Sequence, residues 1–242
     1  MIENIKIEIS EDSSSTLFLP DKKEHYHSIH GAINEAKVVY IEAGMLAKIA
    51  DRVNLKTSET PSLHTLSIFE MGFGTALNAL LTWIEAEKHQ IPVQYTAIEA
   101  FPLPESIFSQ LNYAQKVEAR YMDFYLRLHH SPWEQTQELS PYFQLTKRKG
   151  DMNALPKEAY TNAFDLIYYD AFAPEIQAEL WTLDCFRKMY GFLKSQGILT
   201  TYCAKGQVKR NLKDAGFCVE SLAGPLGKRE ISRARKCANP TI

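Results

Sequence analysis

The stretch that decides the fold is "SIFEMGFGTALNALLTW", which runs from Ser67 to Trp83. It opens in an apolar run, Leu66 to Met71, that is typical of a buried strand, and two glycines follow with the spacing G-x-G. The next apolar residues recur at helical spacing and predict a helix with one buried face: Leu77, Leu80, Leu81 and Ile84. Gly72 and Gly74 then serve either a turn with positive φ or the close approach of a ligand to a helix N-terminus.

The bulk composition indicates an ordinary globular chain. Its 242 residues allow one large domain or two small ones, and 45% hydrophobic with 23% charged residues is typical of such proteins. The net charge of −2 means that any nucleic-acid binding depends on a local basic patch. The N-terminal "MIENIKIEIS" is not typical of a signal peptide, and no run reaches the roughly 20 apolar residues of a membrane helix.

Neither the cysteines nor the histidines form a recognisable metal motif. The four cysteines are far apart without C-x-x-C, which predicts reduced thiols in a cytoplasmic protein rather than a disulfide framework or a zinc site. They are Cys185, Cys203, Cys218 and Cys237. The run H-x-H-x-x-H has no obvious carboxylate ligand beside it, so no metal is predicted there. Its members are His25, His27 and His30.

Strand-like and helix-like segments alternate along most of the chain. Two short strands, 5–9 and 17–19, come first, and a helix over 31–50 follows in which 38–41 also suits a strand. The segment 114–141 is predicted to be helical. Further strands are expected at 64–71, 93–100, 142–151, 163–172, 197–203, 218–224 and 229–236, with helices at 75–88, 103–113, 175–193 and 207–215. This alternation predicts an open, mostly parallel sheet with helices on both faces and ligands at the carboxyl ends of its strands.

Polar residues and glycines follow four successive core strands. The first is followed by Gly72-Phe73-Gly74, the second ends at Glu99, the third precedes Asp151, and the fourth precedes Asp170. Taken alone, each residue is equally typical of a turn, a helix cap or a solvated strand end. Their recurrence at the same edge of the sheet favours one binding site.

The glycine spacing helps to choose the cofactor. A dinucleotide fingerprint requires a third glycine where this chain has Leu77, so a pyrophosphate is not favoured. S-adenosylmethionine needs a glycine-rich bend at its methionine part, an acid on its ribose, and an acid or amide near its adenine amino group. The bend, Glu99 and Asp151 suit these three tasks in that order.

Several longer strings carry a family resemblance. They are "EMGFGTALN", "YTAIEAFPL", "GDMN", "FDLIYYDAFAPEIQAELWT", "DAGF", "GPLGKREISRA" and, upstream, "EHYHSIHGAINEAKVVYIEAG". From about Leu17 to Lys236 the chain resembles the methyltransferase of the tRNA 5-methylaminomethyl-2-thiouridine biosynthesis family (the MnmC type, in its standalone MnmD-like form). One departure is Ala76, where the family usually has glycine; alanine suits a helix N-terminus, so only a local adjustment is expected.

The resemblance implies a fold and a division of the chain. The fold is an α/β, Rossmann-like class I S-adenosylmethionine-dependent methyltransferase, with a seven-stranded, mostly parallel sheet, helices on both faces and an N-terminal extension. Residues 1–60 form the extension packed on the core, and residues 61–242 form the methyltransferase domain. The flavin oxidase fused to some relatives is not expected, because the chain is short and has no second glycine-rich fingerprint.

The resemblance also implies a reaction. S-adenosylmethionine methylates the primary amine of 5-aminomethyl-2-thiouridine at the tRNA wobble position and leaves S-adenosylhomocysteine. Asp170 is the candidate catalytic residue that holds and orients the amine. No metal, membrane or obligate protein partner is implied beyond a functional link to the enzymes that make the aminomethyl intermediate. The implied cofactor contacts are Tyr26, Ser28, Glu42, Gly44, Met71, Gly72, Phe73, Gly74, Thr75, Asn78, Glu99, Ala100, Phe101, Asp151, Met152 and Asp170.

The tRNA requires both a slot for the base and a basic surface. Phe172 and Pro174 are predicted to wall the pocket, with Trp181 and Tyr202 as further candidates for the uridine slot. The strings "GKREISRARK" and "TKRKG" supply basic residues, and alternate residues of a strand share one face. The predicted phosphate contacts are Lys228, Arg229, Arg233 and Arg235.

Three other functions fit parts of the same pattern. A spermidine synthase-like aminopropyltransferase, or another small-amine methyltransferase, shares the sheet, the ribose acid and the late aspartate. A nicotinamide dehydrogenase is disfavoured by Leu77. A non-enzymatic tRNA-binding module on a methyltransferase scaffold is disfavoured by the intact glycine turn and Asp170.

Overall fold

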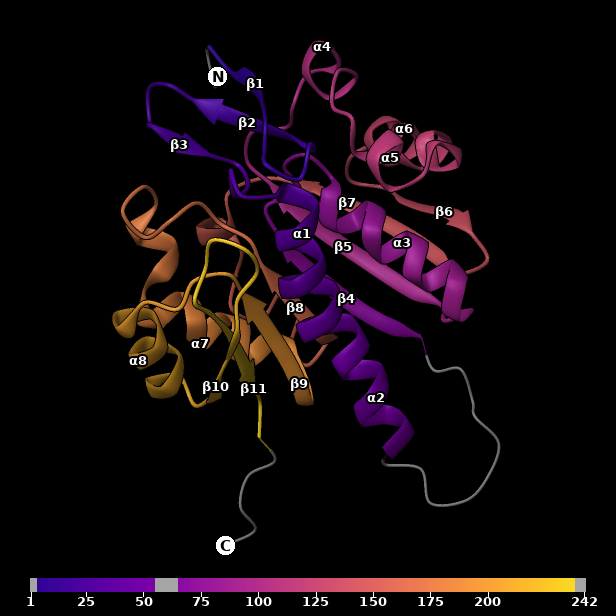
Figure 1. Ribbon diagram of the computed structural model, residues 1–242. Helices are drawn as coiled ribbons and strands as arrows, with labels where there is room; N and C mark the ends of the chain where they lie inside the picture. Colours follow the sequence, from indigo (N-terminus) through magenta and orange to yellow (C-terminus); the bar gives the residue numbers. More distant parts are fainter. Residues whose placement is uncertain (1–3, 55–64, 238–242) are drawn as a thin grey trace, which may run out of the picture.

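The protein is built around one mixed sheet with helices on both faces (Figure 1). The computed structural model describes residues 4–54 and 65–237. The order of the sheet is β10-β11-β9-β8-β4-β5-β7-β6. Its strands are β4 (Leu66–Met71), β5 (Val93–Glu99), β6 (Thr136–Ser140), β7 (Phe143–Lys149), β8 (Phe164–Tyr169), β9 (Leu193–Thr201), β10 (Cys218–Ala223) and β11 (Glu230–Arg235).

The predicted fold class is confirmed, but the predicted number of strands is wrong. The five central strands are parallel, while β10, β11 and β6 run antiparallel to their neighbours. The described residues form eight strands in this sheet, because β6 lies inside the segment 114–141 that was expected to be helical. Its polar side chains suit an edge strand that is open to solvent on one side.

Helices cover the two faces according to the alternation of apolar residues along each strand. Ile68 and Tyr168 lie in one core cluster with residues of η1 (Lys37–Leu46) and α3 (Leu77–His89), whereas Phe69 and Ile167 lie in a second cluster with residues of α7 (Leu183–Phe192) and α8 (Gly206–Asp214). The remaining helices are α1 (Ala32–Ala36), α2 (Ala47–Asn54), α4 (Glu105–Phe108), α5 (Tyr113–Val117), η2 (Ala119–Tyr121), α6 (Met122–His130), η3 (Met152–Ala154) and η4 (Ala178–Trp181).

The N-terminal region packs on the same core. A small antiparallel sheet contains β1 (Lys6–Ile9), β2 (Ser15–Leu19) and β3 (Glu24–His25). The helix that follows is continuous from α1 through the π-helical η1 to α2, so residues 38–41 are helical and not a strand. Leu17 and Val39 belong to the core cluster that covers one face of the large sheet. The predicted division between residues 60 and 61 falls outside the described residues.

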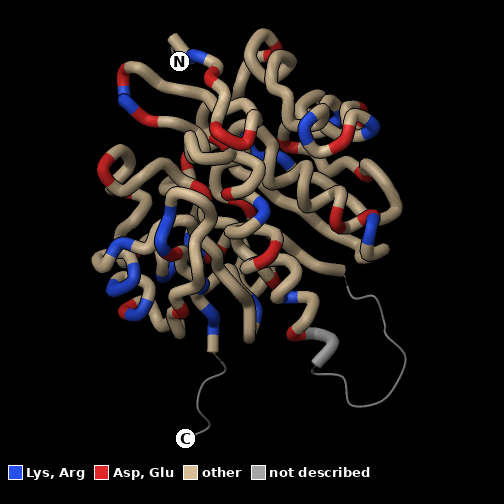
Figure 2. Tube along the Cα trace, in the orientation of Figure 1, with Lys and Arg blue, Asp and Glu red and all other residues tan. Residues whose placement is uncertain are grey.

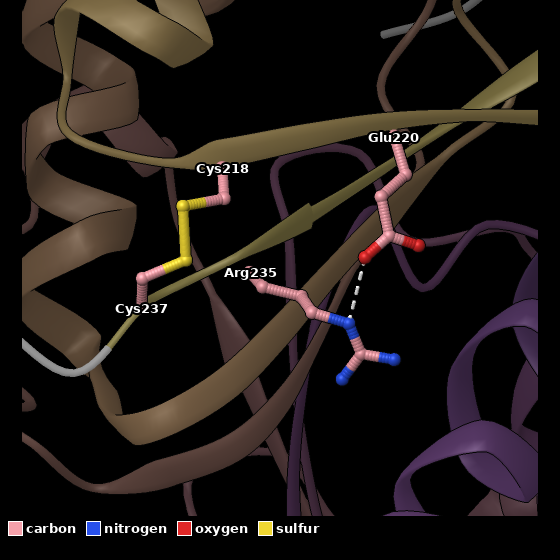
Figure 3. The surroundings of a disulfide bond; sticks show 4 residues. All are labelled: Cys218, Glu220, Arg235 and Cys237. Carbon is pink, nitrogen blue, oxygen red and sulfur yellow. Dashed lines mark hydrogen bonds and ion pairs between the residues drawn. A yellow bond between two sulfur atoms is a disulfide. The ribbon is translucent and has the colours of Figure 1, made fainter.

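A disulfide joins the last two cysteines (Figure 3). Cys218 opens β10, and Cys237 follows β11 with a Cα–Cα distance of 6.3 Å between them. The expectation of four reduced thiols is therefore wrong for this pair, because antiparallel pairing brings together two cysteines that are 19 residues apart in sequence. Cys185 and Cys203 are buried free thiols.

Candidate active site

A cavity of about 640 Å³ lies at the carboxyl ends of the central strands. The order of these strands reverses between β4 and β8, and such a switch point is where open α/β sheets bind ligands. The structure brings most of the predicted site residues together here. Those that line the cavity are Tyr26, Ser28, Met71, Gly72, Phe73, Gly74, Thr75, Asn78, Glu99, Ala100, Phe101, Asp151, Met152, Asp170, Phe172, Tyr202 and Lys228.

The glycine turn after β4 is shaped for close backbone approach. Gly72 has φ +92°, and a Cβ atom on it would lie 2.6 Å from the backbone oxygen of Asp170. Gly74 has φ +47°. Ala76 also has a left-handed backbone, with φ 60°, at the start of α3. The expectation that alanine suits this position is therefore wrong in one respect, since a left-handed alanine costs about 1 kcal/mol that glycine avoids.

Two carboxylates lie at the ends of the strands β5 and β7, on the same edge of the sheet as the turn. Glu99, at the end of β5, accepts hydrogen bonds from the backbone N–H groups of Gly74 (2.9 Å) and Phe101 (2.8 Å). These bonds fix its carboxylate beside the glycine turn, in the position predicted for a ribose-binding acid. Asp151 caps the short η3 helix by accepting from the N–H of Asn153 at 2.8 Å. Its cap role and its place in the cavity lining are thus compatible.

Asp170 follows β8 and faces the turn. Its two carboxylate oxygens accept from the Tyr40 hydroxyl (2.6 Å) and from the Asn78 side-chain nitrogen (2.8 Å). Burial raises the pKa of Asp170 to about 7, while its bond from Tyr40 acts in the opposite direction. A carboxyl group with this pKa changes charge near neutral pH, which suits a group that exchanges a proton with a ligand.

The segment before α1 forms a wall of the cavity. Tyr26 makes an edge-on contact with Phe172, the ring centroids lying 5.0 Å apart. The His27 ring nitrogen Nε2 lies 2.7 Å from the hydroxyl of Thr75 in the glycine turn. Burial lowers the pKa of His27 to about 4, so the ring is neutral near pH 7. The three histidines of this segment face different partners, because His25 contacts Glu8 and His30 contacts Glu11.

An ion pair crosses the cavity from the C-terminal hairpin to α1. Lys228 donates to the buried carboxylate of Glu35, and its ammonium also lies 4.0 Å from the ring centroid of Tyr202. The lining as a whole carries more acids than bases, a composition that suits a cationic ligand. The acids are Glu24, Glu35, Glu99, Asp151, Asp170 and Glu179, and the lysines are Lys22 and Lys228.

Four residues that were predicted to contact the cofactor or the uridine lie outside this cavity. Gly44 packs on the sheet, where a Cβ atom would lie 3.2 Å from the Tyr168 ring, and Glu42 is an exposed neighbour on the same helix. Trp181 is buried and donates to the backbone oxygen of Phe172 at 2.8 Å, so it supports the cavity wall from behind. Pro174 is not among the lining residues. Helix packing and loop support account for these positions, and sequence spacing does not distinguish such roles from ligand contact.

The predicted basic strand face is largely neutralised within the fold. Arg233 and Arg235 both donate to Glu220, at 2.9 and 2.8 Å, and Figure 3 shows the bond from Arg235. Arg235 also pairs with Asp51 of α2. Arg229 is exposed. Lys147, from the second basic string, is buried and donates to the backbone oxygens of the residues at 128 and 129. The two arginines therefore hold the hairpin and α2 together, which their alternation alone did not reveal.

Sequence reasoning missed several groups of the site. Tyr40 and Glu35 lie on a helix whose pattern indicated only burial, and the helix brings them within reach of Asp170 and Lys228. The cavity also includes Lys22, Glu24 and His27 from the N-terminal segment and Gln177 from the loop after β8. No clear signal marked them, since Asn34, Lys37, Glu42 and Lys48 are also polar or charged residues of this helix.

The family model of the S-adenosyl-L-methionine-dependent methyltransferases matches residues 112–237, which is more than half of the chain. The chain belongs to this family. Its matched region includes β7, β8 and β9 and thus Asp151 and Asp170 in the cavity.

Among the described residues, no helix is long and apolar enough to cross a membrane. Within the same residues, no group of three or more metal-ligating side chains gathers at one place.

Several curated relatives of this methyltransferase carry the name "tRNA 5-methylaminomethyl-2-thiouridine biosynthesis bifunctional protein MnmC". The protein from Methylobacillus flagellatus is 28% identical over 221 residues, which are 88% of this chain and 33% of the relative. The protein from Legionella pneumophila is 29% identical over 228 residues, or 85% of this chain and 33% of the relative. The chain thus spans about a third of the length of the curated relatives it matches.

Solved structures support the fold of the methyltransferase. The structure of MnmC2 from Aquifex aeolicus superposes with a TM-score of 0.72 at 22% identity, covering 99% of this chain and 73% of that one. Spermidine synthase from Thermotoga maritima gives a TM-score of 0.59 at 13% identity, with 98% of this chain and 70% of that chain covered. At these identities both likenesses concern the fold alone.

Proposed function

We propose that this methyltransferase N-methylates the primary amine of 5-aminomethyl-2-thiouridine at the tRNA wobble position. The observation that carries the proposal is Asp170, an acid with a pKa of about 7 that faces the glycine turn inside an acidic cavity. Such a site suits a cationic amine beside a cationic methyl donor. The names of the relatives supply the substrate, since they refer to the pathway of 5-methylaminomethyl-2-thiouridine in tRNA.

The residues present fit S-adenosylmethionine. Gly72 lets the chain after β4 approach the backbone oxygen of Asp170 at a distance that a Cβ atom would not allow, and the excess of carboxylates suits a ligand with a sulfonium and an ammonium group. Gly72 and Gly74 would hold the methionine part, Glu99 the ribose, and Asp151 the adenine amino group. When bound, the cofactor supplies an electrophilic methyl group on its sulfonium.

Asp170 prepares the substrate amine. An alkylammonium has no lone pair to attack with, so one proton must leave before the methyl group is accepted. The Asp170 carboxylate takes that proton, which leaves a neutral amine and a neutral carboxyl group, and a pKa of about 7 suits this exchange at neutral pH. Because Tyr40 and Asn78 hold both oxygens, the amine meets the carboxylate in one fixed orientation.

The uridine base would enter between aromatic residues of the cavity. Tyr26 and Phe172 are already in edge-on contact, and Tyr202 borders the same space while donating to the backbone oxygen of Ala171 at 2.8 Å. Aromatic faces accept an unstacked base without regard to its sequence context. We assign the uridine slot to these three residues, with Trp181 and Pro174 in supporting positions.

The tRNA backbone would dock on the basic face of α8 and the neighbouring β10–β11 turn. Figure 2 shows lysine and arginine positions along α8. Arg210, Lys213 and Arg229 are exposed and form no ion pair with any acid among the described residues, whereas Lys205 pairs with Glu175 in the loop that borders the cavity. This surface therefore continues from the cavity wall and carries charge that the β11 arginines do not offer.

Reversal of charge on this surface tests the docking site. We expect the double variant Arg210→Glu/Lys213→Glu to bind tRNA about tenfold more weakly, with a smaller slope of log affinity against log salt, because fewer counterions are released. Binding of S-adenosylmethionine should not change. Lys37→Glu/Lys116→Glu is the matched control, since both lysines are exposed and form no ion pair among the described residues but lie on η1 and α5, away from α8. Equal loss in both variants would contradict the assignment.

The proposed reaction is tested by methyl transfer to tRNA. The protein is mixed with labelled S-adenosylmethionine and tRNA from cells that lack this activity, and the tRNA is digested to nucleosides. Label in 5-methylaminomethyl-2-thiouridine is the expected result. Unlabelled tRNA together with cofactor binding in calorimetry would reject the substrate and retain the methyltransferase assignment.

A small polyamine is the second candidate substrate, since the acidic cavity suits any primary amine and spermidine synthase shares the fold. Assays with putrescine and decarboxylated S-adenosylmethionine separate the two, because only an aminopropyltransferase forms spermidine.

We further propose that residues 1–60 act as an extension packed on a methyltransferase domain of residues 61–242. The proposed location is the cytoplasm, where tRNA is modified.

A further inference from the structure

Glu70 is a buried carboxyl group directly beneath the glycine turn. It lies on β4, two residues before Gly72, and its side chain is 1% exposed. Neither of its carboxyl oxygens has a hydrogen-bond partner among the described residues. An unpartnered polar group in the interior costs stability, and an unpartnered charge costs far more. The proposed mechanism gives this residue no task.

The register of the sheet shows what Glu70 faces. Glu70 is paired with Tyr168 on β8, and Tyr95 on β5 is paired with Ile68, two residues earlier on β4. Side chains two residues apart share one face of a sheet, so Glu70, Tyr95 and Asp170 all lie on the face covered by α3. Asn78 reaches this face from the first turn of α3 and binds Asp170.

The unpartnered atoms around Glu70 include an acceptor that only a proton on Glu70 would satisfy. They are the two oxygens of Glu70, the side-chain oxygen of Asn78 and the hydroxyl of Tyr95. A carboxylate has no hydrogen to offer the Asn78 oxygen, because both groups only accept. A protonated carboxyl group supplies the O–H donor that the Asn78 oxygen lacks. The other Glu70 oxygen is an acceptor for the Tyr95 hydroxyl in either charge state, so it is the Asn78 oxygen that requires the proton.

The charges around Glu70 favour the same state. Burial raises the pKa of Glu70 well above its usual range, and the nearby Asp170 and Glu99 raise it further. Tyr95 and Asn78 oppose the increase, and no cation is among the described residues that act most strongly on this carboxyl. Two neighbouring carboxyl groups rarely both ionise, so Asp170, which has two donors, is the one that carries the charge.

We propose that Glu70 is a neutral carboxylic acid and a positioning residue for Asp170. Its O–H holds the Asn78 oxygen, which fixes the side-chain amide in the orientation that directs its nitrogen to Asp170. With the amide reversed, an oxygen would face the Asp170 carboxylate and repel it. Glu70 thus acts on the reaction through Asn78, without touching cofactor or substrate.

Infrared spectroscopy tests the protonation state without any substrate. In protein with carbon-13-labelled glutamate, the difference spectrum between wild type and Glu70→Gln at pH 8 should contain the carbonyl band of a protonated carboxylic acid. The matched control is Glu138→Gln, an exposed glutamate on β6, whose difference spectrum should contain a carboxylate band. A carboxylate band for Glu70 at pH 8 would overturn the proposal.

Activity of the variants tests the positioning role, and this arm rests on the proposed function. Glutamine also has one donor and one acceptor, so Glu70→Gln should retain kcat within about fivefold. Glu70→Leu has neither and should lower kcat about a hundredfold with little change in cofactor affinity, since misplacement of Asp170 affects the chemical step. Equal loss in both variants would show that a negative charge is needed. If no variant, and not even wild type, methylates tRNA, the proposed substrate fails while the spectra still decide the state of Glu70.

Discussion

Replacement of Asp170 with alanine should lower methyl transfer to tRNA about a thousandfold. The carboxylate is the group that removes the amine proton and fixes the direction of attack, and the cavity offers no second acid held by the same donors, Tyr40 and Asn78. The rate is measured from the transfer of labelled methyl groups at saturating cofactor. Turnover at the wild-type rate would remove Asp170 from the mechanism.

Two further measurements separate chemistry from folding in this variant. Binding of S-adenosylmethionine to Asp170→Ala, measured by calorimetry, should largely survive, because the glycine turn and Glu99 are unchanged. In the wild type, kcat/KM should fall as the pH drops below about 7, since the protonated form of Asp170 cannot accept the amine proton. Asp170→Asn keeps the shape of the side chain and should be as inactive as the alanine variant.

Replacement of Gly72 with alanine should abolish cofactor binding. The new Cβ atom would lie 2.6 Å from the backbone oxygen of Asp170, and the backbone of Gly72, at φ +92°, is rarely adopted by other residues. Because the obstructing atom belongs to the backbone, the strand ends must separate, and we expect a loss of about 3 kcal/mol in the free energy of unfolding. Calorimetric titration with S-adenosylmethionine and chemical denaturation measure the two effects.

Gly150 provides a matched control for this substitution. It lines the same cavity, yet a Cβ atom on it meets nothing within 4 Å and its φ is not in the left-handed region. Gly150→Ala should therefore bind cofactor as the wild type does and unfold at the same denaturant concentration within about 0.5 kcal/mol. Loss of binding in both variants would indicate that the cavity tolerates no added methyl group and that Gly72 has no special role.

Much of the site was predictable because a local signal in the sequence, the end of a strand, places each of its residues. Gly72, Glu99, Asp151 and Asp170 each end or follow a strand, and parallel strands place their carboxyl ends at one edge. The position of β6 was not predictable in the same way, because a short polar edge strand lacks the apolar run by which buried strands are recognised.

The predictions that the structure does not support concern residues whose partners lie far away in the sequence. Arg233 and Arg235 formed a basic stripe in sequence, but Glu220 and Asp51, which neutralise them, lie on other elements. The pairing of β10 with β11 brought Cys218 to Cys237 in the same way. Gly44 appeared suited to a ligand and instead allows a helix to approach Tyr168.

The sequence by itself determined the parallel centre of the sheet, the glycine turn and the edge at which the acids gather, since period, turn chemistry and chain order are local properties. Only the tertiary structure decided the charge states and partners of those acids. Tyr40 and Asn78 reach Asp170 from two different helices, and Glu70 has its environment from β5, β8 and α3 together. The pKa of a carboxyl group depends on burial and on every group around it, and these are set when the elements pack.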